Sequence, residues 1–566
     1  MARFGDELVA AKELAERWAI HDPDPVTRGK IDALVDAGDP SLIRLFQGRL
    51  GFGTAGLRAK VGPGPQQMNA LVVRQTTAAV VDWLRKNGVD SPRVVIGFDA
   101  RRDSAAFAAH AAAAVNGSGG RALCSDQAAP TPVYAHAVLA ESADAAVVIT
   151  ASHNPPDDNG YKLYLSDGLQ LVSPADAEIA QLIGELAGSW SERGSQIDDA
   201  FAELDGADLG ATSHWLAEHR DTAVATLFTD DRTVRIAYSA MHGVGGAPVV
   251  AAFAAAGFDP PDLVLEQFEP DGDFPTVPFP NPEEPGAFDM AVALAEEIKA
   301  DAAFANDPDA DRLAVAVPSR SGAGFVALSG NELGVLLADH VLAHTSGDDR
   351  LVARSIVSSR QLDAMAAGLG ITCHVSLTGF KWVARPIVSH PEHRFVFGYE
   401  EAIGYCIGKH VRDKDGVSAA LVAAEMFAGF GARRSNAWQR LDELAAEHGV
   451  FANHPMSVRF DQEPARIHAL MEQVEASPPT TLAGSPVVAA GAVGLGALPK
   501  TSGLHLICED DTQVIVRPSG TEPKIKAYIE VLESVPGKQL ANVAAARSAA
   551  AERLAEVVAD VQALLA

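Results

Sequence analysis

Short apolar runs alternate along the chain with longer segments rich in alanine, beginning near residue 51. Apolar runs of about four to eight residues indicate buried strands, and the longer segments indicate helices. The strands predicted in this way are 93–98, 143–150, 234–239, 302–305, 351–357 and 395–397, and the helices are 70–86, 104–115, 247–256, 290–299 and 361–369. Helices that separate buried strands are typical of α/β domains with mostly parallel sheets.

This alternation occurs three times, and the pattern changes in the last fifth of the chain. There, 514–517 and 526–532 are predicted strands and 542–565 is a predicted amphipathic helix. Two polar segments with little apolar content, 188–212 and 451–462, are predicted linkers. The sequence therefore predicts three related α/β domains followed by a fourth domain of a different kind.

The first fifty residues are predicted to be helical, because 11–20 and 28–37 are rich in helix formers. We expect them to form an extension that packs on the rest of the protein. The predicted division is 1–50 for the helical extension, 51–212 for the first domain, 213–328 for the second, 329–450 for the third and 451–566 for the fourth.

The charge of the chain excludes some partners. Its 566 residues include 45 basic and 74 acidic side chains, which gives a formal net charge of −29. Such a charge repels nucleic acid and anionic lipid, so neither is an expected partner. If the substrate is an anion, the site must concentrate positive charge locally.

The cysteines and the N-terminus indicate a cytoplasmic protein. Cys124, Cys373, Cys406 and Cys508 are widely spaced, so neither a zinc site nor a disulfide framework is expected. The charged N-terminus lacks the apolar core of a signal peptide. No apolar stretch reaches the roughly 18 to 20 residues of a membrane span.

Three aspartates, Asp307, Asp309 and Asp311, alternate along a segment between two predicted strands. Carboxylates at this spacing can converge on one hard cation, and Mg²⁺ keeps positions open for water or phosphate. The glutamate and glycine spacing of an EF-hand loop is absent. A solvated acidic loop is the competing interpretation, but carboxylates between apolar strands would repel one another without a cation. The segment therefore predicts a Mg²⁺ site.

Ser152 directly follows the strand that ends at Thr150, where open α/β sheets place their ligands. The surrounding residues are not the Gly-x-Ser-x-Gly turn of a serine hydrolase, which argues against acyl transfer. A serine can instead carry a phosphoryl group, whose oxygens would supply a further ligand to a metal at the aspartates. Lys162 is positioned to return toward this site, although a lysine at a strand edge is the competing interpretation.

A third polar segment follows the predicted strand near residue 515. It brings a guanidinium group, hydroxyl groups and flexible backbone N–H donors together, from Arg517, Ser519, Gly520, Thr521 and Lys524. Arginine can bind two phosphate oxygens at once, and successive backbone N–H groups form anion sites. A solvated Pro/Gly turn is the competing interpretation, and the clustering favours a phosphate site.

Glu400 and Glu401 form a fourth motif, just after the predicted strand 395–397. Carboxylates accept hydrogen bonds from vicinal hydroxyl groups, so the motif favours a polyol substrate. An acidic surface turn is the competing interpretation and would be preferred if the motif stood alone.

Together, these four motifs resemble those of the α-D-phosphohexomutase superfamily. The phosphoserine loop (150–155), the metal loop (307–312), the sugar loop (398–401) and the phosphate loop (517–523) occur in the order of that family. Each motif alone is moderately specific, whereas four in one order are highly specific. The resemblance covers nearly the whole chain.

The resemblance implies a four-domain architecture, with three related α/β domains plus a C-terminal α+β phosphate-binding domain around a central cleft. It implies that Ser152 is phosphorylated in the active enzyme and that Mg²⁺ bridges this phosphate and Asp307, Asp309 and Asp311. It also implies a bisphosphorylated sugar intermediate, with glucose 1,6-bisphosphate or an equivalent sugar bisphosphate as activator.

The resemblance also assigns further site residues. The residues near the transferred phosphate are Arg58, His153, Lys162 and Arg312. The residues that bind the sugar and its other phosphate are Thr378, Gly379, Lys381, Glu400, Glu401, Arg517, Ser519, Gly520 and Thr521. The segment 409–416 is similar to a third-domain segment near the sugar. Both His153 and Lys162 are candidates for the general base.

One position departs from the family. Ala402 stands where the common sugar loop, Glu-x-Ser, has serine, which removes one hydroxyl contact. With the loop 378–381 and the N-terminal extension, the chain resembles a branch that contains phosphopentomutases, glucose 1,6-bisphosphate synthases and some phosphoglucomutases. The reaction class is thereby predicted, and the sugar stays open.

The predicted enzyme is a phosphosugar mutase of the glucose 1-phosphate/glucose 6-phosphate type, with mannose, pentose or bisphosphate-synthase activity as alternatives. It is expected to act on a small sugar phosphate as a monomer or homodimer. Two other interpretations are a phosphatase that transfers the phosphoryl group to water and a sugar-phosphate-binding protein with a degenerate site.

Overall fold

The computed structural model describes residues 2–53, 56–204, 212–460, 465–494, 498–499, 501–518 and 524–565. The chain forms two compact units. The first comprises Met1–Leu227, Arg235–Ala316 and His410–Leu421, and the second comprises Phe228–Val234, Val317–Lys409 and Val422–Ala566. Among the described residues, no helix combines the length and apolar composition that a membrane span requires.

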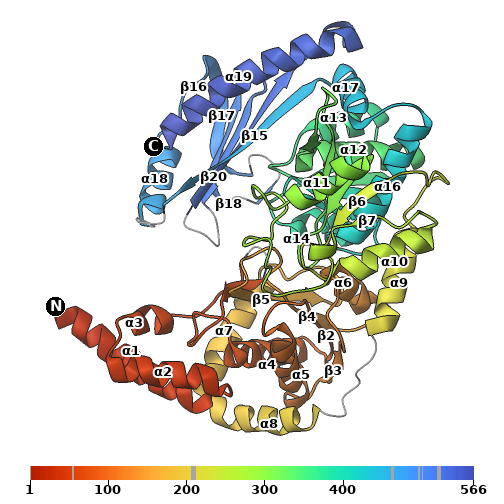
Figure 1. The fold of residues 1–566 in the computed structure, drawn as a ribbon. Coiled ribbons are helices and arrows are strands. Elements are labelled where there is room, and N and C mark those ends of the chain that lie inside the picture. Colours follow the sequence, from red (N-terminus) through yellow and green to blue (C-terminus); the bar gives the residue numbers. More distant parts are fainter. Residues whose placement is uncertain are drawn as a thin grey trace. The chain divides into compact units, whose positions relative to one another are not determined.

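The N-terminal segment is helical, as the sequence predicted. Its helices are α1 (Ala2–His21), α2 (Pro25–Ala37) and α3 (Ser41–Phe46), drawn in red in Figure 1. Asp24 caps α2 by accepting a hydrogen bond from the backbone N–H of Val26. The helices bury Trp18, Ile31 and Phe46 in a core that includes residues of the first domain.

A mixed sheet with helices on both sides follows. Its strands are β1 (Leu57–Lys60), β2 (Arg93–Phe98), β3 (Arg121–Cys124), β4 (Ala145–Ile149) and β5 (Asp158–Leu165), in the order β1-β5-β4-β2-β3. Its helices are α4 (Ala70–Lys86), α5 (Ser104–Gly117), α6 (Thr131–Ala140), α7 (Ala175–Gly188), α8 (Trp190–Ala202) and α9 (Thr212–Val224). The strand β4 is buried along its whole length, which explains its continuous apolar sequence.

The second and third sheets are shorter. The second has β6 (Ile236–Ser239), β7 (Asp262–Leu263), β8 (Ala302–Ala305), β9 (Ala314–Pro318) and β10 (Phe325–Ala327), with α10 (Gly246–Ala256), a 3₁₀ turn at Leu265–Gln267 and α11 (Asp289–Ile298). The third has β11 (Arg350–Ser355), β12 (Thr372–Ser376), β13 (Arg394–Glu400) and β14 (Gly404–Ile407), with α12 (Gly330–His344), α13 (Gln361–Leu369), α14 (Phe380–Val383), α15 (Pro386–Ser389), α16 (Gly416–Ala432) and α17 (Ala437–His448).

Among the described residues, these three sheets share one strand order. They contain β3-β2-β4-β5, β7-β6-β8-β9 and β12-β11-β13-β14. In each sheet, the first of these four strands along the chain (β2, β6 or β11) pairs in parallel with both of its neighbours. The last strand pairs antiparallel. The prediction of three related α/β domains is confirmed, and the sheets are mixed because each contains an antiparallel strand after its parallel ones.

The C-terminal domain is built differently. Its strands are β15 (Val450–Arg459), β16 (Thr481–Leu482), β17 (Ser485–Val493), β18 (Thr501–Cys508), β19 (Gln513–Pro518) and β20 (Lys524–Glu533), and its helices are α18 (Ala465–Ala476) and α19 (Val543–Leu564), with 3₁₀ turns at Pro536–Lys538 and Leu540–Asn542. The paired strands run antiparallel. Figure 1 shows α19 lying along this sheet, and their side chains share one apolar core.

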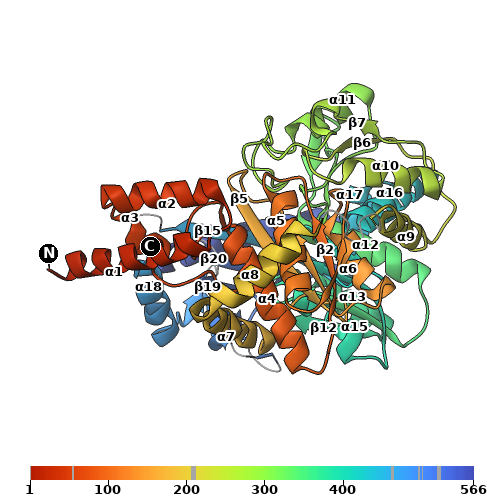
Figure 2. The ribbon, with the colours of Figure 1, turned by 90° about the horizontal axis from the view of Figure 1, so that it is seen from below.

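Two predicted linkers are regular structure instead. The segment 188–212 contains α8, whose Trp190 and Ile197 are buried, and Figure 2 shows this helix beside α4 and α5. Its few apolar residues are separated by polar ones, which hid the amphipathic pattern. The segment 451–462 lies mostly in β15. It is an edge strand, so one of its sides is partly exposed and its sequence tolerates Pro455.

Candidate active site

Ser152 lies in a strained turn at the carboxyl end of β4. Its backbone φ is 54°, in the left-handed region that residues with a side chain rarely adopt. The Thr150 side-chain oxygen holds the turn by accepting a hydrogen bond from the Ser152 N–H at 2.9 Å. The Ser152 side chain is buried, with the residue 1% exposed. Strain of this kind in a buried turn is typical of functional sites.

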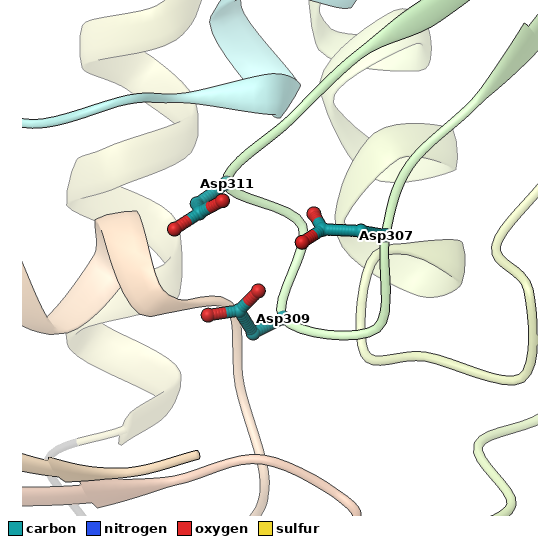
Figure 3. A group of neighbouring side chains, drawn as sticks. All are labelled: Asp307, Asp309 and Asp311. Atoms are coloured by element: carbon teal, nitrogen blue, oxygen red, sulfur yellow. The ribbon is translucent and has the colours of Figure 1, made fainter. Parts of the chain in front are cut away.

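The three aspartates lie on the loop between β8 and β9, and their carboxylates point toward one another (Figure 3). One carboxylate oxygen from each lies within 4.8 Å of the others, and all three residues are buried. The loop is shaped by its own polar contacts. The Ala310 N–H donates to the Asp307 carbonyl at 2.8 Å, and the Arg312 N–H donates to the Asp307 carboxylate at 3.1 Å.

The serine and the aspartates meet directly. The Ser152 hydroxyl donates a hydrogen bond to Asp307 Oδ2 at 2.8 Å. The Thr131 hydroxyl, at the start of α6, donates to Asp309 Oδ2 at 2.7 Å. The predicted proximity of the phosphoserine loop and the metal loop is therefore present in the structure.

Cationic side chains surround the aspartates. The Lys162 ammonium lies 2.7 Å from both Asp309 Oδ2 and Asp311 Oδ2, and Lys414 lies 3.1 Å from Asp311 Oδ2. Burial alone would lower the pKa of Lys162, but the two carboxylates outweigh it and hold the pKa above its usual value. Lys162 lies on β5 between β4 and β1, so it is not a lysine at a strand edge.

Two arginines add to this positive field. Arg312 Nε lies 3.9 Å from Asp307 Oδ2 and 3.9 Å from Asp311 Oδ1, while its Nη1 lies 3.4 Å from Glu283. Arg58, on β1, is close enough to be influenced by Asp309 and Asp311, although burial lowers its pKa. The site thus concentrates positive charge in an acidic protein, as an anionic substrate requires.

The donor set fits a metal ion. Asp309 Oδ1 and Asp311 Oδ1 are buried and have no hydrogen-bond partner among the described residues. Buried carboxylate oxygens without a partner are costly, and a hard cation would satisfy them. The grouped carboxylates and these unpartnered acceptor atoms support the prediction of a metal site.

His153 lies beside the Ser152 hydroxyl. Its Nδ1 is 3.2 Å from Ser152 Oγ, and its ring meets Phe279 edge to face, with 6.4 Å between centroids. Burial, together with Arg312 and Arg58, lowers the pKa of His153 well below its usual value. The imidazole is therefore neutral at physiological pH.

The predicted sugar loop lies in the second unit, at the end of β13. Glu400 Oε1 accepts a hydrogen bond from the Gly379 N–H at 2.7 Å, which joins the predicted segment 378–381 to this loop. Glu401 Oε2 accepts from the hydroxyls of Ser355 at 3.1 Å and Ser358 at 3.2 Å. Burial and the adjacent Glu400 raise the pKa of Glu401 to about 7.

Gly330, the first residue of α12, packs against the predicted sugar loop at a place where a side chain would not fit. A Cβ at Gly330 would lie 1.8 Å from the Glu401 carbonyl oxygen. Gly330→Ala is therefore expected to displace the sugar loop, lower the free energy of unfolding by about 1–3 kcal/mol and raise KM for the sugar phosphate. Thermal unfolding and steady-state kinetics measure the two effects.

The control for this substitution is Gly184→Ala in α7, where a Cβ meets nothing within 4 Å. That variant is expected to gain about 0.5–1 kcal/mol of stability and to keep its KM, because alanine is preferred to glycine inside a helix. An unchanged KM in the Gly330 variant would contradict the proposed part of this loop in substrate binding.

Arg517, the last residue but one of β19, lies beside the aromatic ring of Tyr528, with its guanidinium carbon 5.8 Å from the ring centroid. Its pKa is also influenced by Glu401 and Glu400, so the predicted phosphate site and the sugar loop are neighbours within this unit. The other predicted members of the phosphate site, Ser519, Gly520 and Thr521, lie outside the described residues. Thr378 and Lys381 lie on the same segment as Gly379, whose N–H donates a hydrogen bond to Glu400.

Some residues of the site were not predicted from the sequence. Lys414 was recognised only as part of a segment, and Thr131, Asp99 and Arg101 were not singled out. Asp99 and Arg101 follow β2, which pairs with β4, so they lie beside Ser152 at the same edge of the sheet. Adjacent strand ends were therefore a signal available in the sequence.

Family models match most of the chain. Residues 49–187, 218–322 and 329–448 match domains I, II and III of phosphoglucomutase/phosphomannomutase, each described as alpha/beta/alpha. The chain belongs to the phosphoglucomutase/phosphomannomutase family. This confirms the predicted family and, with it, the predicted enzyme class, an isomerase of phosphosugars.

Individual relatives agree with this assignment. A probable phosphomannomutase from Haemophilus influenzae is 37% identical over 82% of this chain and 93% of its own. A phosphopentomutase from Homo sapiens is 33% identical over 93% of this chain and 92% of its own. The crystal structure of a putative phosphomannomutase from Thermus thermophilus has a TM-score of 0.64 at 20% identity, covering 90% of this chain and 99% of that one, and supports the fold.

Proposed function

We propose that this protein moves a phosphoryl group between two oxygens of a sugar phosphate, with Ser152 as the phosphate carrier and Mg²⁺ held by Asp307, Asp309 and Asp311. The observation that carries the proposal is the contact of the Ser152 hydroxyl with Asp307, at 2.8 Å, within a buried carboxylate triad. A phosphate on Ser152 would add an oxygen ligand at this place. Bound there, Mg²⁺ would neutralise charge on the phosphate oxygens.

The protein's own residues have distinct parts in the proposed reaction. In the first transfer, a sugar hydroxyl attacks the phosphorus of phosphoserine, the bond between phosphorus and Ser152 Oγ breaks, and a new bond joins phosphorus to the sugar oxygen. Lys162, Arg312 and Arg58 stabilise the negative charge of the moving group. Such positioning and charge neutralisation account for most catalysis of phosphoryl transfer.

His153 is the better of the two candidates for the base that takes the hydroxyl proton. Lys162 is protonated, because two carboxylates lie 2.7 Å from its ammonium. His153 is neutral and its Nδ1 lies 3.2 Å from Ser152 Oγ, so it is able to accept the proton. In the second transfer the bisphosphate presents its other phosphate, Ser152 Oγ attacks that phosphorus, and the proton returns to the sugar oxygen that leaves.

The predicted sugar and phosphate loops are proposed to recognise the sugar and the phosphate that is not being transferred. Glu400 and Glu401 would accept hydrogen bonds from sugar hydroxyls, with Thr378, Gly379 and Lys381 beside them. Arg517 would bind the phosphate that is not being transferred, together with Ser519, Gly520 and Thr521. A guanidinium group suits this task because it can hold two phosphate oxygens at once.

The proposed substrate is glucose 1-phosphate or glucose 6-phosphate, with glucose 1,6-bisphosphate as activator. Mannose and pentose phosphates are the alternatives, since relatives named phosphomannomutase and phosphopentomutase are similar to this chain. Ala402 supports a broad sugar preference, because it removes one hydroxyl contact from the loop. The protein is proposed to work in the cytoplasm, as a monomer or homodimer.

The test is an assay of the purified protein with Mg²⁺ on 1-phosphates and 6-phosphates of glucose and mannose and on the corresponding phosphates of ribose and deoxyribose. The expected result is isomerised sugar phosphate, fastest with glucose. Intact-mass measurement after incubation with glucose 1,6-bisphosphate is expected to show one added phosphoryl group, located on Ser152.

Two outcomes would overturn the proposal. Release of inorganic phosphate without isomerised sugar would indicate a phosphatase that uses the same serine. An unmodified Ser152, combined with binding of sugar phosphates but no reaction, would indicate a binding protein. Faster turnover of a pentose phosphate would keep the mechanism and correct the substrate.

A further inference from the structure

Arg101 binds the phosphoserine loop through the backbone carbonyl oxygens of that loop. Among the described residues, its guanidinium donates hydrogen bonds to the carbonyl oxygens of Ser152, Asn154, Pro155 and Asp158. The bond to Asn154 measures 2.6 Å and the bond to Pro155 measures 2.9 Å. The Arg101 side chain is 0% exposed, so it is not a surface contact.

Asp99 completes a closed set of contacts around Ser152. Its carboxylate lies 3.3 Å from Arg101 Nε and accepts a hydrogen bond from the Thr150 hydroxyl at 2.6 Å. The Thr150 oxygen in turn accepts from the Ser152 N–H at 2.9 Å. The N–H of Ser152 is thus held through Thr150 and its carbonyl through Arg101, and Asp99 joins the two.

Only a guanidinium group can hold this turn in one conformation. Several carbonyl oxygens that point toward one centre repel one another unless a donor with several N–H groups lies between them. Arginine offers five N–H donors in a rigid plane and stays charged when buried, whereas lysine offers three on a flexible chain. The ring of Phe274 covers the guanidinium, 5.1 Å from its centroid, and limits its movement.

We propose that Arg101, braced by Asp99, is a positioning residue that fixes the direction of Ser152 Oγ and thereby sets the rate of phosphoryl transfer without touching the substrate. The inference rests on the proposed function of Ser152. The left-handed backbone of Ser152 explains why a positioning residue is needed. This turn is unfavourable on its own and would relax once the Ser152 carbonyl was released.

The test compares Arg101→Ala with the matched control Arg350→Ala. Arg350, on β11, is also buried and donates to the carbonyl oxygens of Leu342, Thr345 and Gly347, but it belongs to the second unit, whereas the phosphoserine loop belongs to the first. We expect Arg101→Ala to lower kcat by about 100-fold with little change in KM, because small displacements of a reacting group have effects of this size. Arg350→Ala is expected to lower the melting temperature and keep kcat.

Chemical rescue separates positioning from a structural role. Guanidinium ion, added far below denaturing concentrations, is expected to raise the kcat of Arg101→Ala and its rate of Ser152 phosphorylation by glucose 1,6-bisphosphate. It is expected to leave the kcat of Arg350→Ala unchanged. Wild-type kcat in Arg101→Ala, or a defect confined to melting temperature and KM, would overturn the inference.

A second variant applies if Arg101→Ala does not fold. Thr150→Val keeps the shape of the side chain but removes the hydroxyl between Asp99 and the Ser152 N–H, and it is expected to lower kcat while KM stays constant. An unchanged kcat in that variant would overturn the inference. If the wild-type protein neither isomerises a sugar phosphate nor becomes phosphorylated on Ser152, the proposed function fails instead, which distinguishes the two failures.

Discussion

Replacing Ser152 with alanine is expected to lower kcat/KM for phosphosugar isomerisation by at least about 10⁴-fold, since loss of a covalent nucleophile has effects of this size or larger. No other described hydroxyl donates to the Asp307 carboxylate, so no second carrier is in place. The variant is also expected to take up no phosphoryl group from glucose 1,6-bisphosphate. Coupled assays measure the rate, and intact mass measures the phosphorylation.

The control is Ser166→Ala, at an exposed position in the turn after β5, which is expected to keep full activity. Full mutase activity in Ser152→Ala would contradict the proposed mechanism. Ser152→Gly distinguishes the loss of the hydroxyl from the effect of backbone strain. Glycine adopts the left-handed conformation of this residue without cost. The glycine variant should be as inactive as the alanine variant but more stable by about 1 kcal/mol.

The candidate reacting groups could be chosen from the sequence because each follows a strand. Ser152 follows β4 and Asp307 follows β8, and in α/β folds polar residues at such places gather at one edge of a sheet. Buried strands with continuous apolar sequences were recognised for the same reason. Helix α4 and strand β2, for example, begin and end where the pattern predicted.

Other features could not be predicted from a local pattern. Helix α8 buries only a few residues on a mostly polar surface, and β15 is an edge strand with one exposed side, so neither had a clear apolar period. Lys414 reaches Asp311 from a segment about a hundred residues further along the chain, and a distant ion pair leaves no local signal. The place of Arg101 after β2 was a signal in the sequence, but its contacts were not, because they are made to backbone carbonyl oxygens, which any sequence provides.

The charge problem posed by the composition is resolved by this placement of cations. A chain with a net charge of −29 repels a sugar bisphosphate at long range. Screening by salt confines that repulsion to about 8 Å at physiological ionic strength. Within that distance of the aspartates, Lys162 and Lys414 offer ammonium groups whose partners include the carboxylates proposed to bind the metal. The carboxylates therefore position both the proposed Mg²⁺ ion and the cations that meet the phosphate.

The substitutions Asp307→Asn and Asp311→Asn are each expected to change two quantities, the stabilisation of the protein by Mg²⁺ and kcat. Mg²⁺ at a hundred times its Kd should raise the free energy of unfolding of the wild-type protein by about 2.7 kcal/mol. Either variant should lose this gain, because one carboxylate ligand is missing. Each should also lower kcat by about 10³-fold, the size of effect seen when a charge-stabilising group is removed from a transition state.

Without Mg²⁺, the two variants should differ, because their ion pairs differ. Asp311 is within 3.1 Å of Lys162 and Lys414, so Asp311→Asn leaves the buried ammonium group of Lys162 and the partly buried one of Lys414 each with one carboxylate partner fewer. We expect it to lose about 1–3 kcal/mol of stability. Among the described residues, the ion pair of Asp307 is a long one, with Arg312 at 3.9 Å, and asparagine can keep the contact with Ser152, so Asp307→Asn should melt close to the wild type. Thermal unfolding with and without Mg²⁺ measures both effects, with the exposed Asp259→Asn as control. An undiminished Mg²⁺ stabilisation in both variants would show that the ion binds elsewhere.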